Sequence, residues 1–157
     1  MTAIFLHGLD SSSKGRKGRF FRAHFPDMLV PDFSGDLQSR MTQLNSILNK
    51  ISNIIMIGSS YGGLMATLYA MSNENRVKKI ILLAPALNFA EFAQLADRKI
   101  SVPTWIYLGS RDEVTPLVEV KSAAMKTFSK LKFLVSDDDH FLRRTFAEIN
   151  WHHHFDR

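Results

Sequence analysis

The chain has 157 residues, of which 45% are hydrophobic and 22% are charged, and its formal net charge is +5. This length predicts one compact domain spanning residues 1–157, and the composition is that of a globular protein with a core of its own. The absence of cysteine excludes disulfides, thiolate metal ligands and a thiol nucleophile.

Two features bear on where the protein works. The N-terminal segment Met1–His7 lacks the basic region and the long apolar stretch of a secretory signal. Apolar runs such as Ile54–Ile57 are far shorter than the ~20 residues that cross a bilayer. We therefore expect a cytoplasmic protein that has no membrane partner.

Part of the positive charge is concentrated in the segment from Lys14 to Arg22. A basic run of this kind can contact phosphate, so nucleic-acid binding is one hypothesis for it. No aromatic stacking platform, zinc ligand set or nucleic-acid motif accompanies the run. We interpret it as a solvated loop or helix face, and we expect no nucleic-acid partner.

Six apolar segments rich in β-forming residues predict strands. Several are unbroken apolar runs, which is typical of parallel strands that are buried on both faces. The expected strands are Ala3–Leu6, Met28–Val30, Ile54–Ile57, Lys79–Leu83, Thr104–Leu108 and Lys132–Val135.

Helical patterns separate these strands. Strands that alternate with helices indicate an α/β fold with right-handed crossovers, in which chemistry gathers beyond the carboxyl ends of the strands. The first expected helix has an apolar stripe from Leu37 to Ile51 and is capped by Asp36, and the second is Tyr61–Met71. A third begins at Thr115-Pro116, where a capping side chain precedes the proline, and the last carries Leu142, Phe146 and Ile149.

Four of the strands end in segments with polar or glycine residues. A serine, an acid and a histidine occur in that order, each just past a strand, and this is the chain order of an α/β-hydrolase triad. The four segments are His7-Gly8-Leu9-Asp10, Gly58-Ser59-Ser60-Tyr61-Gly62-Gly63, Gly109-Ser110-Arg111-Asp112 and Asp137-Asp138-Asp139-His140.

Ser60 is the candidate nucleophile. A sharp strand-to-helix turn brings neighbouring backbones very close, and Gly58 and Gly62 remove the side chains that would collide there. The helix that follows directs its free N–H groups and its dipole toward a developing oxyanion. Ser59 is the rival hydroxyl but lacks the symmetric glycine flanks, and a purely structural helix-capping serine is the alternative.

His140 is the candidate base, because a loop after the last strand can fold its imidazole over the serine. Asp112 is the candidate acid that orients the base, with a helix-capping or solvent-facing acid as the alternative. Asp137, Asp138 and Asp139 compete for that role, and we expect them to be solvated, although one of them can assist.

The other histidines are given structural roles. We expect His7 to shape the loop after the first strand. The contiguous run His152–His154 has diverging side chains, so we interpret it as a polar C-terminal tail and expect no metal site. The backbone N–H groups of Leu9 and Tyr61 are the candidate oxyanion hole.

These motifs, together with Val30-Pro31-Asp32-Phe33 and Gly109 to Pro116, resemble the α/β-hydrolase superfamily, and within it the compact bacterial serine esterases without a large cap domain. The resemblance implies a three-layer α/β/α sandwich with a mainly parallel six-stranded sheet of order 2-1-3-4-5-6. The family has further strands before the oxyanion loop, which this sequence lacks.

The segment in which many relatives carry a lid is short here. Only Ala86–Ser101 intervene between two strands, which is enough for one helix with Phe89, Phe92 and Leu95. We interpret these side chains as core packing, with one wall of an acyl pocket as the alternative. A minimal lid predicts an open site for small or accessible acyl groups.

Three functional hypotheses follow. The leading one is hydrolysis of a small-molecule carboxylic ester or thioester through an acyl-enzyme on Ser60, with no cofactor or metal. A thioesterase or other hydrolase of anionic acyl substrates is the alternative, because the basic run follows the oxyanion loop. A non-catalytic binding module on the same fold is the third.

Overall fold

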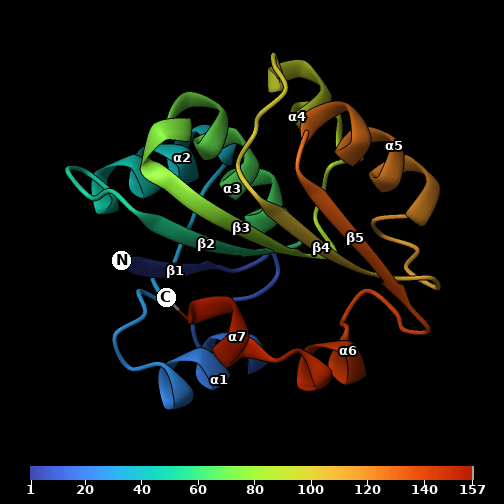
Figure 1. The fold of residues 1–157 in the computed structure, drawn as a ribbon, viewed down its shortest axis with the longest axis horizontal. Helices are drawn as coiled ribbons and strands as arrows, with labels where there is room; N and C mark the ends of the chain where they lie inside the picture. The colour runs from blue at the N-terminus through green and yellow to red at the C-terminus, as the bar shows by residue number, and fades with distance from the viewer. Residues whose placement is uncertain (157) are drawn as a thin grey trace.

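All strands of the sheet run parallel in the computed structural model, which describes residues 1–156 (Figure 1). Each strand pairs with its neighbour in the chain, so the sheet has the order β1-β2-β3-β4-β5. The strands are β1 (Thr2–Leu6), β2 (Ile54–Ser59), β3 (Val77–Leu83), β4 (Thr104–Gly109) and β5 (Leu131–Ser136).

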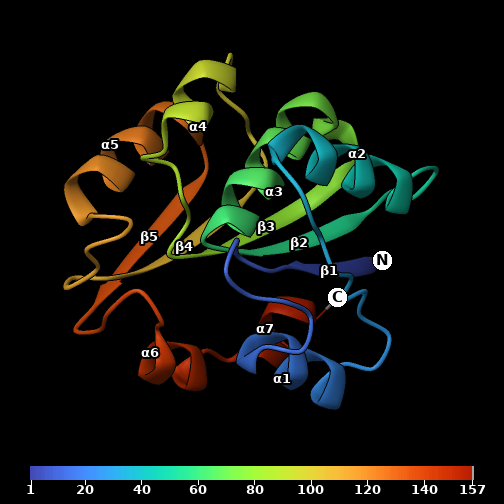
Figure 2. The same cartoon turned by 180° about the vertical axis from the view of Figure 1, so that it is seen from behind.

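Helices cover both faces of this sheet and complete the expected three layers. The helices α2, α3, α4 and α5 lie on one face, and α1, α6 and α7 lie on the other, as the two opposite views show (Figures 1 and 2). No helix within residues 1–156 is long and apolar enough to cross a membrane. The helices are α1 (Arg16–His24), α2 (Leu37–Ile47), α3 (Tyr61–Ser72), the 3-10 turn η1 (Glu74–Arg76), α4 (Ala90–Leu95), α5 (Leu117–Thr127), α6 (Arg143–Glu148) and α7 (Trp151–Phe155).

The core is divided by the sheet into two apolar clusters. Successive residues of β2 alternate between them: Ile54 and Met56 pack under α2 and α3, whereas Ile55 and Ile57 pack toward α1, α6 and α7. All four side chains are fully buried or nearly so. This burial on both faces explains why the strand is an unbroken apolar run.

The prediction of a strand at Met28–Val30 is wrong, although the segment lies beside β1, where that strand was expected. Leu29 forms a single parallel bridge with Ile4 beside β1, where the second strand of the expected order would lie. Pro26 and Pro31 bracket this segment, and proline has no N–H to donate to a ladder. The pairing therefore stops after one residue, and the sheet has five strands.

Of the two predicted helix caps, the one at α2 is confirmed and the one at α5 is wrong. Asp36 caps α2 by accepting a hydrogen bond from the Ser39 N–H at 2.9 Å. At α5, by contrast, Pro116 occupies the cap position, and no side chain caps the helix. The Thr115 hydroxyl, which was expected to cap α5, instead donates to the carboxylate of Asp112.

Candidate active site

The three predicted triad residues meet at the carboxyl edge of the sheet. Ser60 follows β2, Asp112 follows β4 and His140 follows β5. The Nε2 atom of the histidine lies 3.0 Å from the serine Oγ, and its Nδ1 lies 2.7 Å from Oδ2 of the aspartate. One hydrogen-bonded chain therefore joins side chains that are up to 80 residues apart in sequence.

The backbone at Ser60 is strained. Its φ of 53° and ψ of −114° put a non-glycine residue at positive φ, a conformation that costs about 1–3 kcal/mol. Hydrogen bonds hold it there: its N–H donates to the Leu83 carbonyl at 2.9 Å, and its carbonyl accepts from the Ala86 N–H at 3.0 Å. Such strain places the hydroxyl at the tip of the turn, within reach of a base.

The two glycines that flank this turn are required by its close approaches. A Cβ on Gly62 would lie 2.0 Å from the carbonyl oxygen of Leu6, and one on Gly58 would lie 2.4 Å from the carbonyl oxygen of Gly62. Both distances are far inside van der Waals contact. The glycine spacing recognised in the sequence therefore serves the packing of α3 against β1.

Asp112 is buried and fully hydrogen-bonded. Its Oδ1 accepts from the N–H groups of Val114 at 2.9 Å and Thr115 at 2.8 Å, and its Oδ2 accepts from the Thr115 hydroxyl at 2.7 Å. Burial alone would raise the pKa of this carboxyl, but the hydrogen bonds from His140 and Thr115 outweigh it, so the pKa lies below its ordinary value. The carboxylate is thus ionised at neutral pH beside the imidazole.

Thr115 was predicted to cap a helix, but it belongs to this site. Besides its bond to the acid, its hydroxyl lies 3.3 Å from Nδ1 of His140. Its position three residues after the aspartate was the available signal, because a short loop can return a hydroxyl to a preceding carboxylate.

The two proposed oxyanion donors flank the serine. A Cβ on Gly8 would lie 3.4 Å from the Cβ of Ser60, so the loop after β1 that contains Leu9 lies directly against the nucleophile. Tyr61 begins α3, where N–H groups have no partner inside the helix. Within residues 1–156, neither of these two N–H groups donates a hydrogen bond to another protein group.

His7 shapes this loop, as the sequence predicted. Its Nε2 accepts a hydrogen bond from the Phe33 N–H at 2.9 Å, and its Nδ1–H donates to the Gly8 carbonyl at 2.7 Å. The side chain is buried beneath the loop. These two bonds place the ring proton on Nδ1 and leave Nε2 as an acceptor.

The acids beside His140 do not behave as one solvated group. Asp137 is exposed and pairs with Arg111 at 2.8 Å, as expected. Asp138 is buried, and its Oδ2 accepts from the N–H of Thr145 at 3.0 Å and from its hydroxyl at 2.8 Å. The expectation of solvation is therefore wrong for Asp138, which ties the histidine loop to α6.

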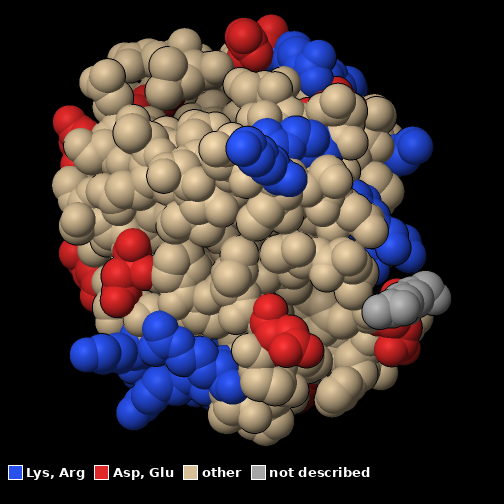
Figure 3. All heavy atoms as spheres, turned by 90° about the vertical axis from the view of Figure 1, so that its left-hand side faces the viewer, with Lys and Arg blue, Asp and Glu red and all other residues tan. Residues whose placement is uncertain are grey.

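The basic segment is only partly the solvated face that was expected. Figure 3 shows Lys and Arg side chains gathered on the lower part of the molecule, where Figure 1 places α1. Two of its side chains reach the segment after His140: the Lys17 ammonium donates to the Phe141 carbonyl at 2.9 Å, and the Arg16 guanidinium donates to the carbonyl of Arg143, at the start of α6, at 3.0 Å. Basic α1 thus adjoins the loop that carries the base.

The pKa of Lys17 is lower than that of an ordinary lysine. Burial, followed by the charges of Arg16 and Arg143, lowers its pKa from 10.5 to about 8, although Asp138 and Asp139 oppose the shift. Its ammonium therefore stays protonated at neutral pH but loses its proton in mildly alkaline solution.

The three C-terminal histidines form part of α7, so the prediction of a polar tail is wrong for His154. This residue is buried, its Nε2 lies 2.9 Å from the Tyr107 hydroxyl, and its carbonyl accepts from the Lys79 ammonium at 2.8 Å. Burial, with a smaller effect of Lys79, lowers its pKa to about 4, so the imidazole is neutral at pH 7. Residues 1–156 contain no group of three or more His, Asp or Glu side chains placed to hold a metal ion.

The comparisons with known proteins agree with this architecture. Residues 31–100 match the family model described as the alpha/beta hydrolase fold. An esterase from Exiguobacterium antarcticum superposes with a TM-score of 0.78 at 15% identity, over 99% of this chain and 92% of the esterase chain. The chain has the α/β-hydrolase fold.

Two further solved α/β-hydrolases share the fold. An alpha-beta serine hydrolase homologue from Coxiella burnetii superposes with a TM-score of 0.77 at 20% identity, over 94% of this chain and 80% of that one. Mouse alpha/beta hydrolase domain-containing protein 10 superposes with a TM-score of 0.74 at 15% identity, over 90% and 82% of the two chains. No curated protein sequence matches this chain.

The segment between β3 and β4 is short, as predicted. It holds only the six-residue helix α4. Phe92 is buried in the core, whereas Leu95 is 54% exposed, so core packing is confirmed for the first and wrong for the second. The Tyr61 hydroxyl donates to Glu91 at 3.0 Å and thereby ties α4 to the start of α3.

Proposed function

We propose that this α/β-hydrolase is a serine hydrolase that cleaves carboxylic esters with small or accessible acyl groups. The single observation that carries the proposal is the hydrogen-bonded chain from Ser60 through His140 to Asp112, built on a strained turn. The esterase and serine hydrolase names of its structural neighbours favour the same activity.

The geometry supports a two-step reaction. His140 Nε2 accepts the Ser60 hydroxyl proton as Oγ bonds to the acyl carbon, and the resulting oxyanion accepts hydrogen bonds from the N–H groups of Leu9 and Tyr61. The imidazolium then returns the proton to the departing alkoxide, which leaves as the alcohol. Asp112 holds the Nδ1–H throughout and stabilises the imidazolium.

Water completes the cycle by the same groups in reverse. His140 takes a proton from a water molecule, the hydroxide oxygen adds to the acyl carbon, and the bond to Ser60 Oγ breaks as Oγ regains a proton. The products are the carboxylic acid and the free enzyme. Every proton transfer in this scheme uses a side chain of this protein.

Exposed apolar side chains next to the reacting groups indicate what the site accepts. Leu9, Val114 and Phe141 are 46%, 50% and 58% exposed. Leu9 carries one of the proposed oxyanion donors, Val114 follows Asp112 by two residues, and Phe141 follows His140 directly. Together with the short lid, they favour an apolar acyl or alcohol group that stays partly accessible to solvent.

A second candidate, hydrolysis of anionic acyl substrates, is favoured by the contacts of α1 with the histidine loop. Lys17 and Arg16 place positive charge beside the site. If the substrate is anionic, turnover of an acyl-CoA should exceed that of a neutral short-chain ester at low salt and fall as salt rises, because exposed charges are screened within about 10 Å at 0.1 M.

For the leading candidate we expect the opposite pattern. Turnover of a neutral short-chain p-nitrophenyl ester should vary little with salt and should exceed that of the acyl-CoA. Initial rates for both substrates across a salt series measure this directly. Salt-sensitive preference for the acyl-CoA would replace the first candidate by the second.

Lys17 is expected to act as a positioning residue for His140. Lys17→Met removes the ammonium bond to the Phe141 carbonyl and should lower kcat/KM about tenfold, since a hydrogen bond to a charged group contributes about 1.5–3 kcal/mol at most. In the wild type, activity should fall as pH rises through about 8, where Lys17 loses its proton. Lys17→Arg retains the charge and should keep activity above that pH.

The lowered pKa of Lys17 also predicts that the free energy of unfolding increases with pH in the alkaline range. Because the pKa of Lys17 is lower in the folded protein, the folded chain binds this proton more weakly than the unfolded chain. The free energy of unfolding of the wild type should therefore gain a contribution as pH rises from about 8 to 10.5, and Lys17→Met should lack it. Urea unfolding at both ends of this range checks the difference, and identical curves would contradict the assignment.

A further inference from the structure

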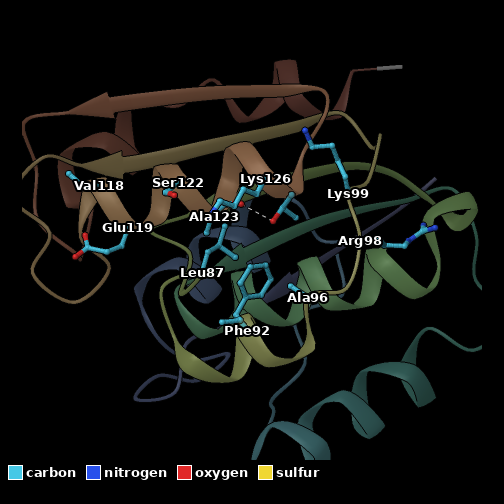
Figure 4. A pocket seen from close by; sticks show the side chains of 12 residues that line it. Leu87, Phe92, Ala96, Arg98, Lys99, Val118, Glu119, Ser122, Ala123 and Lys126 are labelled. Carbon is cyan, nitrogen blue, oxygen red and sulfur yellow. Dashed lines mark hydrogen bonds between the residues drawn. The ribbon is translucent and has the colours of Figure 1, made fainter.

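A cavity of about 720 Å³ lies between α4 and α5, away from the triad (Figure 4). Its volume falls in the range of small-molecule binding sites. None of Ser60, Asp112 and His140 lines it. The mechanism proposed above therefore makes no use of this cavity.

The cavity is an elongated groove with an apolar floor. Leu87 and the buried Phe92 form one wall, and small side chains, Ala96 on one side and Ala123 on α5, leave the space open. The residues that α5 contributes run from Val118 to Thr127, and at ~1.5 Å per residue this gives a length of about 13 Å. A groove of this shape suits an alkyl chain rather than a compact ring.

The charges of the groove are unequally distributed. Figure 4 shows Glu119 at one end of the groove, and Arg98 and Lys99 toward the other. Arg98 is paired with Glu74, whereas the ion pairs within residues 1–156 include neither Lys99 nor Lys126. Two lysines without acidic partners thus line a groove whose apolar lining consists of Leu87, Phe92, Val118 and three alanines.

We propose that this groove binds a single-chain anionic amphiphile, a medium-chain fatty acid carboxylate, with its alkyl chain against Leu87, Phe92 and Ala123 and its head group at Lys99 and Lys126. Burial of the chain supplies the affinity, and the lysines select the charged end. Glu119 repels a carboxylate from the opposite end and so sets one orientation. The site is independent of the proposed hydrolysis.

Calorimetric titration of decanoate, below its micelle concentration, into the Ser60→Ala variant tests this binding. We expect saturable binding with one site per chain. The double variant Lys99→Glu/Lys126→Glu should bind about tenfold more weakly, and Ala123→Phe should abolish binding by filling the groove. Lys130→Glu, an equal change at an exposed lysine outside the groove, should leave the affinity unchanged.

Decanol, which has the same chain without the charge, should bind at least about tenfold more weakly than decanoate. Absence of saturable binding would overturn the proposal, as would an affinity that is unchanged by the double charge reversal or equal for decanol. Since Ser60→Ala retains the groove, these outcomes are separate from the fate of the hydrolase proposal.

Discussion

Ser60→Ala is expected to lower the kcat for ester hydrolysis by about 10⁴- to 10⁶-fold, because within residues 1–156 no other hydroxyl is hydrogen-bonded to Nε2 of the base. His140 Nε2 is hydrogen-bonded to Oγ of this serine at 3.0 Å. Residual turnover should reflect only binding and the oxyanion donors. Steady-state kinetics with a p-nitrophenyl ester measure the loss.

The matched control is the neighbouring serine. Ser59 ends β2 and lies outside the hydrogen-bonded chain, so Ser59→Ala should retain activity within about tenfold of the wild type. Circular dichroism should show that both variants are folded. An active Ser60→Ala protein, or a Ser59→Ala protein with the larger loss, would assign the nucleophile elsewhere.

Asp112→Asn should lower kcat by about 10⁴-fold with little change in the fold. The two backbone N–H groups that bind Oδ1 require an acceptor, so the amide oxygen must take that position. The amide NH₂ then occupies the place of Oδ2 and donates to Nδ1 of His140. The imidazole is forced into its Nε2–H tautomer, which is unable to accept the proton of Ser60.

Thr115→Val serves as the control for this substitution. It removes one hydroxyl bond to the acid but leaves the carboxylate and the tautomer intact, so the expected loss is about tenfold or less. Kinetics and the NMR signal of the imidazole N–H together check the explanation. Full activity of Asp112→Asn would show that the acid has no part in the reaction.

The sequence was sufficient to predict that Ser60, Asp112 and His140 lie together, because a glycine spacing and the order of parallel strands place them. Gly58 and Gly62 had to be small for close backbone contacts, of Gly58 with Gly62 and of Gly62 with Leu6 of β1, and this requirement is visible as a spacing. The acid and the base each follow a strand, and parallel strands bring their carboxyl ends to one edge. The order of strands in the chain therefore predicts that Ser60, Asp112 and His140 lie close enough to form hydrogen bonds.

The prediction of a strand at Met28–Val30 was wrong because an apolar run does not show whether backbone hydrogen bonds to the neighbouring strand can continue. Met28–Val30 has the composition of a strand, and Leu29 pairs beside β1. The prolines on either side limit this pairing to one bridge, and a pattern based on hydrophobicity gives them too little weight.

Roles that depend on distant partners could not be read from the sequence. Asp138 is buried because Thr145 of α6 supplies two hydrogen bonds, and Lys17 is half-buried because α1 packs beside the loop of residue 141. His154 looked like part of a polar tail because its partner, Tyr107, lies in β4. In each case the side chain is polar by type, and only the tertiary contact makes its burial possible.

Labelling with a fluorophosphonate, followed by intact mass spectrometry and peptide mapping, tests the central claim most directly. The reagent phosphonylates a serine only where a base activates it. We predict one adduct per folded chain, located on Ser60, and none on Ser60→Ala. A folded wild-type protein that stays unlabelled, or that is labelled at another residue, would contradict the assignment of Ser60 as the nucleophile and would favour a non-catalytic binding module on the same fold.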